Sequence, residues 1–343
     1  MKGLVYHGEE VLKWEDVEDV SPKKNEVKIK VMAAGICGSD VHGYQGITGR
    51  RIPPMIMGHE FSGVVREVGS DVDTLKPGDR VAPFPMDYCG TCISCQKGDV
   101  QFCPDKKQFG VLTVDGAFAE YICVPAKVCY KLSERVSFSA GSTIEPLAVA
   151  YRGVQHAGDI EGKNILIVGS GTIGLMLVAC VKVKNPAKII VTDLSKTRLD
   201  VAQKMGADIT VNPSESDIKE AIQANTDGHG VDVSFEAVGI TPACVQSLEN
   251  LRIGGTSVWL GQGKKTVEIG MLDIVTRELN VSGSFTYGLD AFKSAVDMLN
   301  QGKIDVGPII SKEAPMDQGA EWFEKLKKPD ELVKVILKGE AEQ

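Results

Sequence analysis

The sequence lacks the features that a membrane or nucleic-acid protein needs. Its 343 residues contain no charge-free apolar window approaching about eighteen residues, so no membrane span is predicted. The first twenty residues have no apolar core of the kind that secretory signals carry, and we expect a soluble, cytoplasmic protein. The net charge is −8 and there is no basic tract, which argues against nucleic acid or an anionic membrane as partner. A small molecule is the expected partner.

Cysteine is sparse except in one short stretch. The chain has nine cysteines, and four of them fall within CGTCISCQKGDVQFC at 89–103. In a reducing cytosol such a cluster favours metal binding over disulfides, the alternative being a loop of free thiols. Cys89, Cys92, Cys95 and Cys103 are spaced to converge on one tetrahedral zinc ion. A shell of four thiolates leaves no open position, so this site is predicted to be structural.

The chain has two regions with different patterns of predicted secondary structure, and its length suits about two domains. Before about residue 150, short strand-like runs alternate with Gly, Pro and Asp turns, which predicts an all-β region. From 153 to 289, apolar strands alternate with helical segments, as in a doubly wound parallel α/β sheet. After 290, a helical segment is followed by a closing strand, LVKVILKG. No internal repeat is evident.

A second, open metal site is predicted from two turn-rich stretches, GICGSDVHGY and MGHEFSG. Cys37 and His59 offer a thiolate and an imidazole, two ligands of a three-ligand catalytic zinc. Glu60 and Glu145 are both candidates for the third ligand, because buried carboxylates are usually paired or bound to metal. Taken alone, Cys37 could equally be a core residue.

A glycine-rich loop, VGSGTIG, follows the apolar run NILIV and opens a helix. Gly169 allows a tight turn, Gly171 allows the backbone to approach a pyrophosphate, and Gly174 allows close packing of helix on strand. Thr172 and Ile173 begin the helix, whose N-terminus favours phosphate charge. The loop therefore predicts a dinucleotide site.

An acidic residue ends the next predicted strand. Asp193 lies 24 residues after Gly169, where a carboxylate can bind a ribose 2′-hydroxyl and repel a 2′-phosphate. NAD is thus predicted over NADP. The alternative is that Asp193 only caps the following helix.

A nicotinamide cofactor beside an open zinc site indicates an alcohol dehydrogenase reaction. Zinc would lower the pKa of an alcohol, and the adjacent carbon would then give a hydride to NAD. Ser39 could accept a hydrogen bond from the alcohol, and His42 could pass the proton to solvent.

These motifs together resemble the medium-chain zinc-dependent dehydrogenases over nearly the whole chain. The matching stretches are GICGSDVHGY, MGHEFSGVV, LKPGDRV, the four-cysteine lobe, DGAFAEY, IEP and GSGTIG. The sorbitol and polyol branch is the most similar, because many alcohol dehydrogenases have a cysteine where this chain has Glu145. The resemblance implies two zinc ions per chain and a catalytic ligand set of Cys37, His59 and a carboxylate, with Glu60 and Glu145 both near the metal.

The same resemblance implies the domain arrangement and the oligomer. Residues 1–152 and 290–343 would form a GroES-like catalytic domain with a zinc lobe at about 87–106, residues 153–289 a Rossmann domain, and the active site would lie in the cleft. Homodimers would pair the nucleotide domains edge to edge, and tetramers also occur in the family. The further cofactor residues that it implies are Arg198 near the adenosine ribose, Val238 along the cofactor, Ser284 near the nicotinamide and Lys334 near the pyrophosphate.

The substrate is predicted to be a polyol or a polyol phosphate. The stretch GYQGITGRRIPPMIMGHEF resembles that of galactitol-1-phosphate 5-dehydrogenases, and Arg50 and Arg51 could bind a phosphate monoester. The alternative for the two arginines is that they lie in a solvated loop and bind nothing. The alternative for the substrate is a free secondary alcohol such as sorbitol, xylitol or 2,3-butanediol. Two other functions remain as alternatives for the whole protein. One is a regulator that binds NAD and zinc but has no enzymatic turnover, and the other is a zinc-free reductase.

Overall fold

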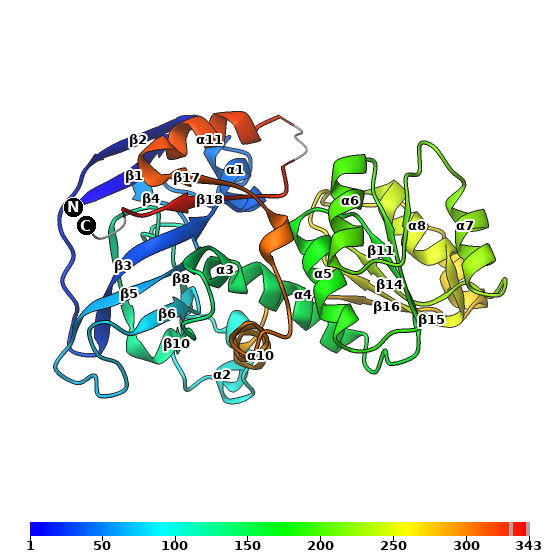
Figure 1. Ribbon diagram of the computed structural model, residues 1–343, viewed down its shortest axis with the longest axis horizontal. Helices are drawn as coiled ribbons and strands as arrows, with labels where there is room; N and C mark the ends of the chain where they lie inside the picture. The colour runs from blue at the N-terminus through cyan, green and yellow to red at the C-terminus, as the bar shows by residue number, and fades with distance from the viewer. Residues whose placement is uncertain (329–331, 341–343) are drawn as a thin grey trace. The chain divides into compact units, whose positions relative to one another are not determined.

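The computed structural model describes residues 1–328 and 332–340 (Figure 1). These residues form two compact units, each with its own core. The first unit comprises Met1–Glu145, Tyr287–Gly302 and Ile310–Gln343, and the second comprises Pro146–Thr286 and Lys303–Ile309. The chain therefore leaves the first unit twice, once for the main body of the second unit and once for the short segment Lys303–Ile309.

A seven-stranded sheet is the centre of the first unit. Its strands follow the order β10-β6-β5-β3-β18-β17, and β9 pairs with β3 beside this path. Neighbouring strands are antiparallel except β17 and β18, which are parallel. The bounds are Glu26–Gly35 (β3), Glu60–Val68 (β5), Arg80–Pro83 (β6), Tyr121–Pro125 (β9), Cys129–Lys131 (β10), Ile310–Pro315 (β17) and Lys334–Lys338 (β18). Figure 1 shows β3, β5 and β18 side by side.

Two smaller sheets complete the strands of this unit. One has the order β2-β1-β4 and the other pairs β7 with β8. Their bounds are Lys2–Gly8 (β1), Val11–Asp16 (β2), Met55–Ile56 (β4), Met86–Asp87 (β7) and Lys107–Gln108 (β8).

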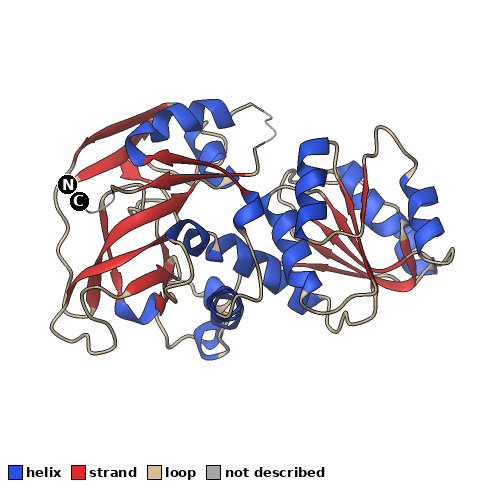
Figure 2. Cartoon of the chain, viewed as in Figure 1, coloured by secondary structure: helices blue, strands red, loops and turns tan. Residues whose placement is uncertain are grey.

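The sequence predicted an all-β region before about residue 150, and this prediction is wrong in one respect, because the first unit also contains helices. Short helices interrupt the strands, and Figure 2 shows them in blue beside the sheets. Side-chain caps explain two of them, because Cys37 caps the first helix and Ser137 caps the third. Runs this short carry too little periodicity to be recognised in the sequence. These short helices are Gly38–Tyr44 (α1), Ile93–Gln96 (α2) and Phe138–Ser142 (α3), with 3-10 turns at Val100–Phe102 and Ala126–Val128. Later in the chain the unit has Leu289–Asn300 (α10), the helical segment that the sequence predicted, then a 3-10 turn at Met316–Gln318 and Gly319–Leu326 (α11).

The second unit is a doubly wound α/β domain, as predicted. Its six strands are all parallel and follow the order β13-β12-β11-β14-β15-β16. The first strand in the chain, β11, is central, and the chain winds outward from it in both directions. The strands are Asn164–Val168 (β11), Lys188–Thr192 (β12), Ile209–Val211 (β13), Val231–Glu236 (β14), Leu251–Trp259 (β15) and Asn280–Gly283 (β16).

Helices cover both faces of this parallel sheet (Figure 1). Leu166 and Ile190 point to one face, where they pack in one core cluster with Ile222 of α7 and Leu248 of α8. Residues 174–181 of α5 are buried as well. The helices are Ile144–His156 (α4), Thr172–Lys182 (α5), Lys196–Met205 (α6), Ile218–Asn225 (α7), Thr241–Glu249 (α8) and Met271–Thr276 (α9), with a 3-10 turn at Gly307–Ile309.

The two units divide the chain at positions close to the sequence-based boundaries but not identical to them. The first segment of the first unit ends after Glu145, within the first turn of α4. Residues 303–309 belong to the second unit. Within residues 1–328 and 332–340, no helix is both long and apolar enough to cross a membrane.

Candidate functional site

The pairing of β3 with β5 brings two distant motifs together. Gly35, the last residue of β3, pairs with Glu60, the first residue of β5. Cys37 follows β3 and His59 precedes β5, so both lie at the same end of the ladder. The ligand atoms of Cys37, His59 and Glu60 all lie within 4.8 Å of one another. Thiolate, imidazole and carboxylate are donors that zinc accepts, and three of them leave an open position.

Helix α1 begins at this cluster. Cys37 is its N-cap, and the Cys37 Sγ accepts hydrogen bonds from the backbone N–H of Ser39 at 3.5 Å and from its hydroxyl at 3.3 Å. His42 lies one turn further along α1, and both Ser39 and His42 are exposed. The structure therefore places Ser39 against the thiolate and His42 on the solvent side of the same helix.

A buried carboxylate supports both ligands. Asp40 is fully buried, its Oδ2 accepts the Cys37 N–H at 3.3 Å, and its Oδ1 lies 3.4 Å from His59 Nδ1. Arg51 Nη2 donates to the same Oδ1 at 2.7 Å. Burial raises the pKa of Asp40, but His59 and Arg51 outweigh this effect and lower it to about 2. With Nδ1 facing Asp40, the Nε2 atom of His59 is the one left for a metal.

Glu60 has a cationic partner. Lys334 Nζ, at the start of β18, donates to both Glu60 carboxylate oxygens at 2.8 and 3.0 Å and to the Ile36 carbonyl at 3.1 Å. Glu60 is 1% exposed and Lys334 is 3% exposed. A Cβ at position 35 would lie 2.3 Å from Glu60 Oε2, so glycine at that position makes room for the carboxylate.

Glu145 lies in the same unit, in the first turn of α4. Its Oε1 accepts a hydrogen bond from the Tyr287 hydroxyl at 2.7 Å. Burial raises the pKa of Glu145 to about 7, and the charge of Glu60 contributes. Glu145 is not part of the three-ligand set, but its charge acts on the same buried region as those of His59 and Glu60.

The four cysteines of the lobe converge as the spacing predicted. Cys89, Cys92, Cys95 and Cys103 have ligand atoms within 4.8 Å of one another. Cys89 Sγ is 3.8 Å from Cys95 Sγ and 3.6 Å from Cys103 Sγ. Backbone N–H groups of Cys92 and Thr91 lower the pKa of Cys89 to about 6. Four thiols held this closely fit a tetrahedral zinc ion with a complete shell.

The glycine-rich loop joins β11 to α5 in the second unit. Gly169 has φ +92° and its N–H donates to the Thr192 carbonyl at 2.8 Å. A Cβ at Gly174 would lie 1.8 Å from the Gly169 carbonyl oxygen, so the helix can approach the loop only with glycine there. Gly171 is the N-cap of α5 and nothing lies within 4 Å of the position of its Cβ. The backbone in front of Gly171 is therefore accessible to a ligand.

Asp193 lies beside this loop, after the end of β12. Its Oδ2 accepts the Ser170 N–H at 2.6 Å and its Oδ1 accepts the Ser195 N–H at 2.9 Å. Ser195, rather than Asp193, is the N-cap of α6. A carboxylate has about four acceptor positions, so further hydrogen bonds to a ligand remain possible.

The other predicted cofactor residues are spread over both units. Arg198 lies in the first turn of α6, and Val238 Cγ2 would be 2.5 Å from a Cβ on Gly169. Ser284 follows β16 and is buried, and its N–H donates to the Trp259 carbonyl at 2.9 Å. Thr172 and Ile173 are the first residues of α5. Lys334 belongs to the first unit, where it contacts Glu60.

The two predicted substrate residues differ in environment. Arg50 is exposed, whereas Arg51 is 7% exposed and is ion-paired with Asp40. Adjacent arginines in a polar loop carry no signal that separates them in the sequence.

Sequence reasoning missed Asp40 and Tyr287. Asp40 had a local signal, because a capping box pairs the N-cap residue with the acidic residue three positions later. Tyr287 had none, since 142 residues separate it from Glu145.

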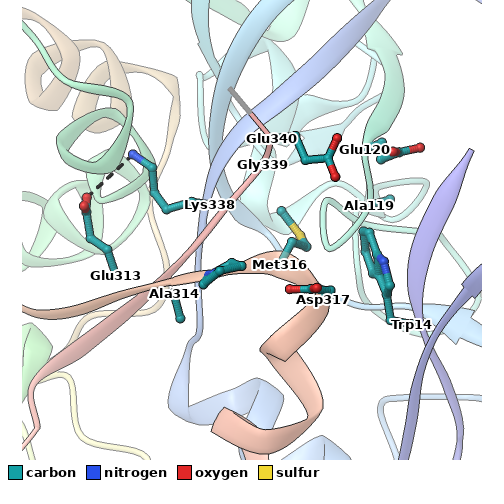
Figure 3. A pocket seen from close by; sticks show the side chains of 11 residues that line it. Trp14, Ala119, Glu120, Glu313, Ala314, Met316, Asp317, Lys338, Gly339 and Glu340 are labelled. Carbon is teal, nitrogen blue, oxygen red and sulfur yellow. Dashed lines mark ion pairs between the residues drawn. The ribbon is translucent and has the colours of Figure 1, made fainter. Parts of the chain in front are cut away.

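A pocket of about 370 Å³ lies elsewhere in the first unit (Figure 3). It is lined by Trp14, Glu120, Glu313, Asp317 and Lys338 among others, and Glu313 and Lys338 form an ion pair of 3.6 Å at one side of it. None of its lining residues belongs to the predicted site, so the predicted chemistry does not use it.

Family models match both parts of the chain. The model described as alcohol dehydrogenase GroES-like domain matches residues 23–134, and the one described as zinc-binding dehydrogenase matches residues 172–301. The sorbitol dehydrogenase of Bacillus subtilis strain 168 is 35% identical over 343 residues, covering 98% of this chain and 97% of its own.

Solved structures agree with these matches. A protein described as a zinc-binding dehydrogenase from Sinorhizobium meliloti 1021, bound to NADP, has a TM-score of 0.91 at 33% identity and covers 98% of both chains. Galactitol-1-phosphate dehydrogenase from Escherichia coli has a TM-score of 0.90 at 28% identity and covers 98% of this chain and 99% of its own.

Metal analysis of purified protein tests the two clusters separately. We expect about two zinc ions per chain, one for each cluster. The Cys37→Ser variant should keep about one zinc ion, the one at the four cysteines, because that set is untouched. The Cys95→Ser variant should lose that ion and keep the one at Cys37 and His59. A wild-type chain that holds a single zinc, also held by Cys37→Ser, would contradict an ion at Cys37 and His59.

Proposed function

This chain belongs to the zinc-binding medium-chain dehydrogenases of the polyol dehydrogenase type, and from that premise we propose that it oxidises a secondary alcohol of a polyol or polyol phosphate with NAD. The reaction converts the alcohol and NAD⁺ into a ketone, NADH and a proton. The observation that carries the proposal is the open cluster of Cys37, His59 and Glu60 in a chain that also has a dinucleotide loop. When bound, zinc supplies Lewis acidity toward an alcohol oxygen, and the nicotinamide accepts the hydride.

We propose that Cys37, His59 and Glu60 hold the catalytic zinc. The mutual distances of their ligand atoms support this set, and the buried Lys334 ammonium offsets the charge of Glu60. Glu145 is the alternative third ligand. The Glu145 carboxylate accepts a hydrogen bond from the Tyr287 hydroxyl, as a ligating carboxylate commonly does.

The proton route would begin at Ser39. Its exposed hydroxyl lies beside the Cys37 thiolate, so a substrate oxygen near the zinc would be within reach of it. His42, exposed on the same helix, would pass the proton to water. An imidazole suits this step because its ring can both accept and donate a proton.

The nucleotide would bind at the loop between β11 and α5. Open space at Gly171 allows a pyrophosphate to approach the backbone, and Asp193 would accept hydrogen bonds from the adenosine ribose. The same carboxylate would repel a 2′-phosphate, which supports NAD over NADP. Arg198, Val238 and Ser284 would line the rest of the cofactor.

The role of Arg50 distinguishes a phosphorylated polyol from a free one as the substrate. Arg51 is engaged with Asp40, so the exposed Arg50 is the residue that we propose to contact a phosphate monoester. A free polyol is the alternative, and the similarity to a sorbitol dehydrogenase supports it.

We also propose that the chain forms a homodimer or tetramer through the edge of the parallel sheet. Strand β16 is the edge strand, and its Val281 is 37% exposed. Nearby in sequence, Met271, Leu272 and Val275 of α9 are 74%, 72% and 60% exposed. An edge strand beside exposed apolar residues is the kind of surface that another chain covers.

A substrate panel tests the reaction and Arg50 together. With NAD, NADH absorbance should appear with galactitol-1-phosphate or sorbitol-6-phosphate, or with sorbitol, xylitol or 2,3-butanediol. If phosphate is recognised, Arg50→Ala should raise KM for a polyol phosphate about tenfold, as expected for a lost charge-assisted bond, and leave a free polyol unchanged. Lys24→Ala, another exposed cation of the same unit, is the control. Equal changes for both substrate types would remove Arg50 from phosphate recognition.

Cofactor choice tests Asp193. Asp193→Asn keeps an oxygen acceptor for Ser170 but removes the negative charge, so kcat/KM with NADP should rise relative to NAD by about tenfold. The readout is the ratio of the two values at saturating alcohol, with Asp200→Asn, an exposed residue of α6, as the control. An unchanged ratio would mean that Asp193 serves the loop alone.

The mass in solution tests the edge-strand interface. Light scattering on a sizing column should give a dimer or tetramer, and Val281→Glu should shift the mass toward the monomer because it places charges on the shared edge. Val11→Glu, on exposed β2 of the other unit, should leave the mass unchanged. A monomeric wild type, or an unchanged Val281→Glu, would argue against this interface.

A further inference from the structure

Arg51 is buried although it belongs to a loop of polar and exposed residues. Its neighbours Arg50 and Ile52 are exposed, whereas Arg51 is 7% exposed. The backbone on both sides is tied to Leu112, whose N–H donates to the Arg50 carbonyl at 2.8 Å and whose carbonyl accepts the Ile52 N–H at 3.1 Å. These bonds fix the loop so that the Arg51 side chain points inward.

A glycine on α1 makes room for this side chain. A Cβ at Gly43 would lie 2.4 Å from Arg51 Cγ, a distance that a non-bonded carbon does not tolerate. The stem of Arg51 therefore packs directly on the backbone of the helix that follows Cys37.

The Arg51 guanidinium contacts Asp40, whose side chain has no solvent exposure. Arg51 Nη2 donates to Asp40 Oδ1 at 2.7 Å, and this oxygen also lies 3.4 Å from His59 Nδ1. The other carboxylate oxygen accepts the N–H of Cys37 at 3.3 Å. One carboxylate thus contacts two of the proposed metal ligands. Its ion-pair partners are Arg51, which is always charged, and His59, which is charged only when protonated.

A buried carboxylate without a cation is strongly unfavourable, and breaking such a pair leaves an uncompensated charge. Without Arg51, Asp40 would rotate toward water or toward another donor. Either movement would release the His59 ring and the N–H of Cys37 from the oxygens that hold them.

We propose that Arg51 is a positioning residue for the catalytic metal, acting through Asp40 on His59 and Cys37. The proposal rests on the proposed function, because it assumes that zinc binds at Cys37 and His59. It also distinguishes the two adjacent arginines, with Arg50 facing solvent and Arg51 supporting the ligands from behind. Residues that orient a ligating histidine typically change metal affinity 10–100-fold when they are altered.

The test compares the two metal sites of the same chain. Arg51→Met keeps much of the side-chain volume but loses the charge. We expect zinc at the open site to bind about 10–100-fold more weakly in competition with a chelator, while the four-cysteine site stays filled. Cobalt substituted at the open site should show an altered visible absorption spectrum, and Arg51→Lys, which keeps the charge, should restore part of the affinity.

Arg80→Met is the matched control. Arg80 is also largely covered, and its guanidinium donates to the Ser133 carbonyl at 2.9 Å and to the Val136 carbonyl at 2.5 Å, so these bonds involve no residue of either cysteine cluster. Its loss should lower the melting temperature and leave the affinities of both metal sites as they are in the wild type. If Arg51→Met does not fold, Gly43→Ala displaces the same side chain without removing its charge, and should weaken the open site selectively.

Two results would overturn the proposal. One is an unchanged zinc affinity and cobalt spectrum in Arg51→Met, and the other is an equal loss of metal from both sites, which would indicate general destabilisation. A wild type that binds zinc only at the four cysteines would instead overturn the proposed function. The two failures are therefore distinguishable.

Discussion

The cluster of Cys37, His59 and Glu60 depends on the antiparallel ladder between β3 and β5. That ladder sets Gly35 opposite Glu60, so the segments that continue beyond it, with Cys37 on one side and His59 on the other, meet at one point. A shift of one residue in this register would turn Glu60 to the opposite face of the sheet and move His59 with it. Strand β18 pairs with β3 on its other side and brings Lys334 to the same end. Three segments far apart in the sequence are thereby joined by backbone ladders and by the Lys334–Glu60 ion pair.

Three carboxylates lie in this part of the first unit, and each has a partner. Asp40 is paired with Arg51, Glu60 with Lys334, and Glu145 accepts from Tyr287. Buried carboxylates are tolerated only when they are paired or bound to metal, so these partners make a polar cluster possible inside the hydrophobic core of the first unit. Small residues complete the arrangement, because Gly35 and Gly43 leave the space that the Glu60 and Arg51 side chains fill.

In the second unit, the strand order decides where the glycine-rich loop lies. The loop after β11 lies where the sheet reverses its winding, between β12 on one side and β14 on the other. Gly169 and Gly174 allow the tight approach of helix and strand, and Asp193 holds the loop from the end of the adjacent strand. The same carboxylate is thus both a support of the loop and the proposed partner of the ribose.

The sequence by itself determined the parts that local spacing encodes. The four lobe cysteines, the glycine loop and the alternation of strands and helices each occupy a short stretch, and the structure has the lobe cluster and the parallel sheet that they predicted. The short helices of the first unit were missed because helices of four to seven residues carry no clear period. Only the tertiary structure decided which polar residues are partners. Arg50 and Arg51 are indistinguishable in the sequence, yet the loop register exposes one and buries the other, and Tyr287 meets Glu145 across 142 residues. Such pairings depend on strand register and side-chain packing, which involve residues from distant segments at once and leave no signal in any one of them.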